Sequence, residues 1–118
     1  MTLDPAALVD MLEMVGDDPA FVGEIVDAYL SDAPDQIRGM TEALAAGDIT
    51  TFGRHAHTLR GNSRNVGATG LAEIARTLEE QARAGDTTGA SDRIEAAANE
   101  LARVTAALAD ARARGWVP

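Results

Sequence analysis

The sequence predicts an all-α protein, an antiparallel up-down four-helix bundle with a short N-terminal capping helix. Hydrophobic residues make up 46% of the 118 residues but aromatic residues only 3%, so mainly Leu, Ile, Val, Met and Ala must fill the core. That mixture favours helices over strands. Apolar residues recur at spacings of three and four, and no segment alternates with a period of two. The length suits one domain, so residues 1–118 are expected to form a single bundle.

Two Asp-Pro pairs predict where the first two helices begin. An aspartate caps the free N–H groups of a helix, and proline is favoured at the first helical position. Asp4-Pro5 therefore begins a short helix that ends at Gly16, and Asp18-Pro19 begins a longer one.

The second helix carries an apolar stripe at helical spacing. Its first members are Phe21, Ile25, Val26, Tyr29 and Leu30. Pro34 interrupts the pattern, so either it kinks one long helix or a second helix restarts at Ala33. Gly47 is expected to end this segment as a C-cap.

Three further helices complete the expected bundle. Asp48 caps a helix over about residues 49–66, whose apolar spacing suits an antiparallel seam. Another begins at Thr69, and after a polar loop over residues 85–91 the last runs to about Arg114. The connections are short, so sequential helices are expected to be antiparallel.

Charge and composition exclude several classes of function. The chain has a net charge of −9, and all ten of its basic residues are arginines. Nucleic acid and anionic membrane surfaces repel so acidic a chain, so neither is an expected partner. There is no cysteine and there are only two histidines, which excludes disulfides and thiolate or His-rich metal sites. No signal peptide or apolar run of membrane-spanning length is visible, so a cytoplasmic, monomeric protein is expected.

One face of the helix over residues 49–66 gathers residues that a plain bundle wall does not need. His57 lies at its centre, opposite the apolar seam. The residues around it are Gly53 and Gly61, four positions to either side, and Arg54, Arg60 and Arg64. Each glycine costs about 1 kcal/mol relative to alanine in a helix, but leaves room for another protein to approach the imidazole. The arginines favour an anionic group there. Taken singly, each feature is also what an ordinary solvent face contains.

The second histidine is expected to do something else. His55 lies about 200° around the helix from His57, so it is expected to pack against or cap an edge of the bundle. The same angle argues against one metal ion being chelated by both, because helical metal pairs use spacings of three or four residues.

The stretch His57-Thr58-Leu59-Arg60-Gly61-Asn62-Ser63, followed by Val66-Gly67-Ala68, resembles the histidine-containing phosphotransfer (HPt) domain family of two-component phosphorelays. The family pattern is His-x-Leu-Lys-Gly-x-Ser, with Gly-Ala or Gly-Leu a few residues later. Asp18-Pro19-Ala20-Phe21 and the Ala-Gly-Asp turn before residue 49 are similar to family features as well. The resemblance covers about residues 1–112.

The resemblance implies a role for each site residue. His57 would accept the phosphoryl group on Nε2, and Gly61 would let the partner close over the ring. Arg60 stands where the family usually has lysine, which keeps the charge but replaces an ammonium with a planar fork. The family commonly has Gln or Glu 22 residues after the histidine, to accept a hydrogen bond from Nδ1; here this is Glu79. We expect Gly53, Arg54, Gly61 and Arg64 to form the docking surface.

The chemistry of Glu79 can also be argued without the family. A nucleophilic imidazole must be neutral, and an acceptor on Nδ1–H fixes the tautomer and stabilises the charge that develops on the ring. The alternative is that Glu79, with Glu73 and Glu80, belongs only to the solvent face of its helix.

The chain lacks a glycine-rich nucleotide loop, so no autonomous kinase activity and no cofactor of its own are expected. The resemblance implies reversible His-to-Asp transfer with response-regulator receiver domains and a sensor histidine kinase, hybrid or not; the receiver would supply Mg²⁺, the aspartyl phosphate and a lysine. A non-catalytic adaptor that binds a signalling partner is the alternative. A metal-binding bundle is set aside, because no Glu precedes either histidine at Glu-x-x-His spacing.

Overall fold

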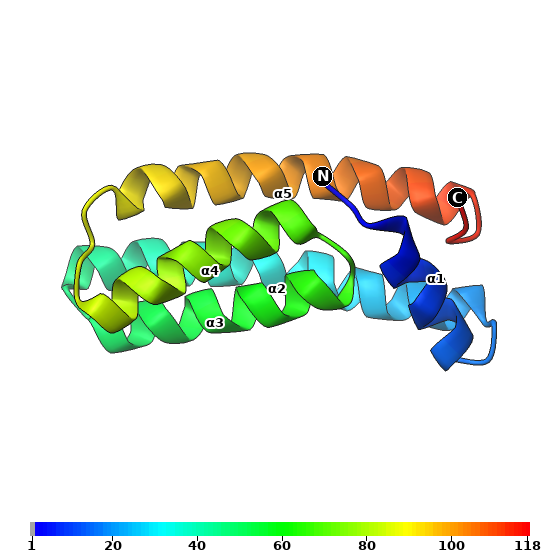
Figure 1. The fold of residues 1–118 in the computed structure, drawn as a ribbon, viewed down its shortest axis with the longest axis horizontal. Helices are drawn as coiled ribbons and strands as arrows, with labels where there is room; N and C mark the ends of the chain where they lie inside the picture. The colour runs from blue at the N-terminus through cyan, green and yellow to red at the C-terminus, as the bar shows by residue number, and fades with distance from the viewer. Residues whose placement is uncertain (1) are drawn as a thin grey trace.

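The computed structural model describes residues 2–118, which contain five α-helices and no strand (Figure 1). They are α1 (Pro5–Met14), α2 (Pro19–Ala46), α3 (Ile49–Asn65), α4 (Thr69–Ala84) and α5 (Ala90–Ala113). The four longer helices run along the length of a molecule that measures 44 × 20 × 20 Å, and α1 lies at one end (Figure 1). None of the helices in the described residues is long and apolar enough to cross a bilayer.

Each of the four long helices packs against two others. Helix α3 lies between α2 and α4, and α5 packs on α2 and α4 from the other side, so α3 and α5 are diagonal neighbours. Helix α1 makes its main helix contact with α2. Between them they enclose a core whose largest fully buried side chains are Phe52, Met40, Leu59, Leu71, Leu78 and Leu108. The outer face of α3, opposite this core, is therefore free to carry chemistry.

The predicted helix starts are confirmed. Asp4 and Asp18 each stand directly before a proline. Each carboxylate accepts a hydrogen bond of 3.1 Å from the backbone N–H of the residue two positions later. Asp48 caps α3 in the same manner, at 3.1 Å from the N–H of Thr51. Helix α2 ends at Gly47, which adopts the left-handed conformation that few other residues tolerate.

Helix α2 decides between the two alternatives at Pro34 and corrects one residue of its apolar stripe. It is a single helix of 28 residues with Pro34 exposed on its surface, so no second helix begins at Ala33. Four of the five predicted stripe residues face the core: Val26 and Tyr29 are buried, and Ile25 and Leu30 pack against it. The prediction is wrong for Phe21, which is 49% exposed, whereas its neighbour Val22 is fully buried. Adjacent positions lie 100° apart, and periodicity alone does not select which of two apolar neighbours faces the core.

The N-terminal segment is tied to the turn that follows α3. The N–H of Asp4 donates to the carbonyl of Gly67 at 2.7 Å. Gly67 has a φ of +78°, and a Cβ there would lie 2.8 Å from the carbonyl oxygen of Asp4, so both the conformation and the close approach require glycine. This contact fixes α1 beside the C-terminal end of α3.

Candidate functional site

His57 lies midway along α3 with its side chain 62% exposed. Its Nδ1 atom is 2.6 Å from Oε2 of Glu79 on α4. A carboxylate only accepts hydrogen bonds, so this contact places a ring proton on Nδ1, and in the neutral imidazole the lone pair is then on Nε2. The ring is thus oriented by the neighbouring helix and presents a nucleophilic nitrogen.

Glu79 is a buried carboxylate, and the positive charges of two arginines compensate for its loss of hydration. Its side chain is only 7% exposed, and both of its oxygens are engaged. Arg60 Nε lies 2.7 Å from Oε1, and Arg83 Nη2 lies 3.0 Å from Oε2, the oxygen that also faces His57. Burial by itself raises the pKa of Glu79, but the hydrogen bond from His57 and the charges of Arg60 and Arg83 outweigh it and hold the pKa below its ordinary value. Glu79 is therefore ionised at neutral pH.

Arg60 touches both members of this pair. Its Nε is buried and is not aimed along a hydrogen bond, so its contact with Glu79 is an ion pair. Its Nη2 atom lies 3.3 Å from Nδ1 of His57. Nδ1 already carries the proton that it donates in the hydrogen bond to Glu79. The approach of Arg60 Nη2 to Nδ1 is therefore a close contact between two donors and not a hydrogen bond.

The two glycines that flank His57 are glycines for different reasons. A Cβ at Gly61 would meet nothing within 4 Å, so this side of the imidazole is open. A Cβ at Gly53 would lie 2.9 Å from Cβ of Ala82 on α4. At Gly53 the missing side chain therefore lets α3 and α4 approach each other, and its role in docking stays a prediction.

Two of the predicted docking arginines are exposed and form no close ion pair. Neither Arg54 nor Arg64 has a carboxylate within 4 Å among residues 2–118, although, besides the hydrogen bonds from Thr51, the charge of Arg54 contributes to lowering the pKa of Asp48. They lie three residues before and seven residues after His57, on the same side of α3. Their charges are available to another molecule, and a role in docking stays a prediction.

His55 faces the other way, as its angle predicted. Its Nδ1 is 2.8 Å from Oε1 of Gln36 on α2, and its ring lies over Gly39, where a Cβ would come within 2.5 Å of Nε2. Gln36 in turn donates to Asp32 at 3.2 Å. His55 therefore joins α3 to α2, with its Nε2 edge against Gly39.

Sequence reasoning missed Arg83. It follows Glu79 by four residues, the spacing at which helical side chains meet, and this was the signal that could have found it. Its importance depends on the burial of Glu79 and on the approach of His57 from another helix, which the spacing alone does not reveal.

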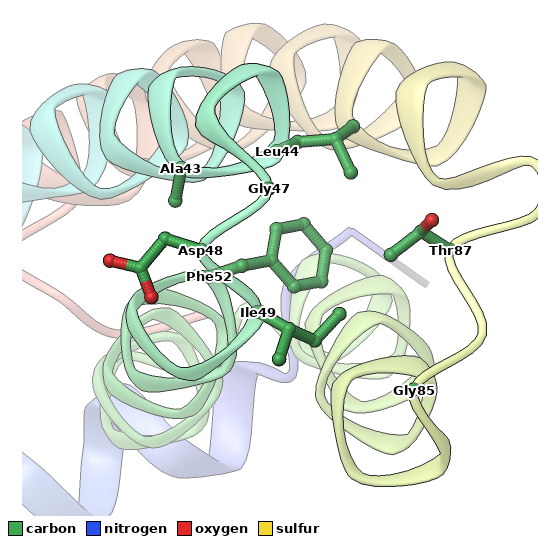
Figure 2. Close-up of a pocket in the computed structure, with 8 residues that line it drawn as sticks. All are labelled: Ala43, Leu44, Gly47, Asp48, Ile49, Phe52, Gly85 and Thr87. Carbon is green, nitrogen blue, oxygen red and sulfur yellow. The ribbon is translucent and has the colours of Figure 1, made fainter.

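A surface pocket of about 270 Å³ lies between the α2–α3 turn and the α4–α5 loop (Figure 2). The ring of Phe52 lies within it, with Leu44 and Ile49 to either side and Thr87 across the opening (Figure 2). The one ionisable side chain in its lining, Asp48, caps α3. This pocket therefore offers no reactive group. No cluster of three metal-ligating side chains occurs among residues 2–118.

Comparison with known proteins agrees with this geometry. The Hpt domain family model matches residues 24–113. The crystal structure of histidine-containing phosphotransfer protein B (HptB) from Pseudomonas aeruginosa PAO1 is similar over 96% of each chain, with 32% sequence identity and a TM-score of 0.87. A search of curated proteins gives no match. The chain belongs to the Hpt domain family.

Proposed function

We propose that this protein is a phosphohistidine carrier that relays a phosphoryl group between receiver-domain aspartates and His57. One observation carries the proposal: an exposed imidazole whose Nδ1–H donates to a buried carboxylate at 2.6 Å, so that Nε2 is the nucleophile. Family membership supports it, and so does the similarity to HptB, a histidine-containing phosphotransfer protein.

In the proposed reaction, Nε2 of His57 attacks the phosphorus of an aspartyl phosphate. The N–P bond forms while the P–O bond to the aspartate breaks, and the aspartate leaves as a carboxylate. Nδ1 keeps its proton throughout, so the ring becomes positively charged, and the negative charge of Glu79 stabilises it. The same steps in reverse pass the phosphoryl group to the next aspartate. Arg60 contributes positive charge beside the ring.

The partner supplies what this chain lacks. Phosphoryl transfer depends on positioning and charge neutralisation, and one exposed imidazole provides little of either. We therefore assign Mg²⁺ and the aspartyl phosphate to the receiver domain. The source of the phosphoryl group would be a sensor histidine kinase or a hybrid sensor kinase. Gly61, Arg54 and Arg64 lie on the surface that would meet the receiver.

The scaffold in this proposal is a monomeric, antiparallel up-down bundle of α2 to α5, with α1 as a short N-terminal cap, formed by residues 1–118 as one domain. The pairing of each long helix with two others and the short connections between them support this interpretation.

The test is intact-mass analysis after treatment with phosphoramidate, a small phosphodonor that needs no cognate partner. The wild type and His55→Ala should each gain one acid-labile phosphoryl group, and His57→Ala should gain none. Because His55 and His57 lie on the same helix, His55→Ala is a matched control for any loss of structure.

Two outcomes would contradict the proposal. If the folded wild type takes up no phosphoryl group, the adaptor alternative is favoured. If label is lost only in His55→Ala, the reactive histidine has been assigned wrongly.

A further inference from the structure

We propose that Arg83 is a positioning residue that selects the reactive tautomer of His57 by pinning Oε2 of Glu79 against Nδ1. The inference rests on the proposed function in one respect: the tautomer matters because Nε2 is the proposed nucleophile. It concerns a residue to which the family resemblance assigned no role, on α4 four residues after Glu79.

The geometry gives Arg83 a distinct place in the cluster. Arg60 approaches Glu79 through Oε1, at 2.7 Å, whereas Arg83 approaches through Oε2, at 3.0 Å. Oε2 is also the oxygen that accepts the proton of Nδ1. Of the two arginines, Arg83 is thus the one bound to the atom that determines the tautomer.

Nδ1 of His57 has two possible hydrogen-bond partners within reach. With Glu79 in place, Nδ1 donates to Oε2 and Nε2 has the lone pair. Arg60 Nη2, a donor, lies 3.3 Å from the same nitrogen. If Oε2 moved away, Arg60 would donate to Nδ1, the ring proton would shift to Nε2, and the ring would lose its outward nucleophile. Holding Oε2 in place therefore decides between a reactive and an unreactive ring.

The charge of Glu79 matters for the same reason. A protonated carboxyl can itself donate a hydrogen bond to Nδ1, which would favour the same unreactive tautomer. The carboxylate is 7% exposed, and a buried carboxylate needs compensation to stay ionised. Two arginines on one carboxylate provide it, and they leave the cluster of Glu79, Arg60 and Arg83 with a net charge of +1, suited to receive a phosphoryl group.

The experiment compares Arg83→Gln with Arg83→Lys and Arg76→Gln. Arg83 is 69% exposed, so its replacement should leave the fold intact. Lysine keeps the charge at this position. Arg76 lies on the same helix and, within the described part of the chain, pairs with the exposed Glu73 and Glu80 and not with Glu79, so Arg76→Gln removes an equal charge from α4 without touching Glu79. For each protein, ¹⁵N NMR of the neutral ring measures the His57 tautomer, and intact mass measures the rate of labelling by phosphoramidate.

We expect Arg83→Gln to lower the fraction of His57 with its proton on Nδ1 and to slow labelling about fivefold, a modest effect because an exposed arginine is replaced. Arg83→Lys should recover most of both, and Arg76→Gln should match the wild type. The inference is overturned if Arg83→Gln and Arg76→Gln have the same tautomer as the wild type, or if wild-type His57 already rests with its proton on Nε2. The tautomer is measured without any phosphodonor, so failure of labelling in all proteins would count against the proposed function alone.

Discussion

His55 and His57 are two imidazoles on one helix, two residues apart, with opposite surroundings. Each has its Nδ1 against an acceptor on a neighbouring helix, Gln36 on α2 for His55 and Glu79 on α4 for His57. They differ at the other nitrogen and in the charge of the acceptor. The Nε2 edge of the half-buried His55 lies against Gly39 of α2, whereas the side chain of His57 is largely exposed beside an acceptor that is ionised. An acceptor on Nδ1 orients a ring; a free Nε2 and a negative acceptor are what make it a nucleophile.

The largest effect on stability is expected from a substitution at Gly39, the residue of α2 against which the ring of His55 lies. A methyl group at Gly39 would lie 2.5 Å from Nε2 of His55, so the ring must leave its place between α2 and α3. We expect Gly39→Ala to destabilise the protein by about 2 kcal/mol, although alanine is the better helix former. Urea unfolding measures this loss. His57 labelling by phosphoramidate in the folded fraction should be unchanged, and a large fall would show that the two histidine sites are coupled.

The second prediction removes the charge that distinguishes the two acceptors. Glu79→Gln gives His57 the same kind of acceptor that His55 has, and we expect phosphoramidate labelling to slow about tenfold, equivalent to about 1.4 kcal/mol in the barrier. An unchanged rate would mean that the acceptor's charge plays no part, and orientation of the ring would be its whole contribution.

The same variant has a signature in the pH dependence of stability. Because the folded pKa of Glu79 lies below its ordinary value of 4.5, ionised Glu79 stabilises the fold above that pH, and this stabilisation is lost as the pH falls through the folded pKa. The wild type should therefore exceed Glu79→Gln in free energy of unfolding at neutral pH, and the difference should shrink in acid. A difference that is constant with pH would contradict the ion pairs with Arg60 and Arg83 as its cause.

A third, smaller effect belongs to the acceptor of His55. Gln36→Ala removes the partner of Nδ1 and also the contact between Gln36 and Asp32. The site is half-buried, so water replaces part of what is lost, and we expect about 1 kcal/mol of destabilisation by urea unfolding. Labelling of His57 should match the wild type. Slower labelling would mean that α2 helps to position the reactive ring.

The sequence predicted what local chemistry determines. The starts of α1, α2 and α3 follow from the capping aspartates, and the angle between His55 and His57 follows from helical geometry. Other features depend on which helix lies alongside. Gly53 and Gly61 are equivalent in sequence, four residues to either side of His57, but α4 comes close to only one of them.

The contacts of Glu79 show the same limit. The family resemblance indicated its partner, and the spacing of four residues could have indicated Arg83, whereas the burial of Glu79 and its contact with Arg60 follow from the packing of α3 on α4. Periodicity alone likewise placed Val26 and Tyr29 of α2 in the core, but it did not show that Phe21 is exposed while its neighbour Val22 is buried.

The smallest effect on stability, and the sharpest test of openness, is Gly61→Ala. A Cβ at Gly61 meets nothing within 4 Å, so the substitution should stabilise the fold by about 0.8 kcal/mol through helix propensity alone. A phosphodonor as small as phosphoramidate should label the variant at the wild-type rate. Transfer from a phosphorylated receiver domain should be slower, because the added methyl stands where a protein surface must come close to the ring. If phosphoramidate and the receiver domain both react with the variant at the wild-type rate, Gly61 is not needed for docking. If both reactions slow equally, the substitution acts on the imidazole itself, and the space beside Gly61 is not needed for the approach of a partner.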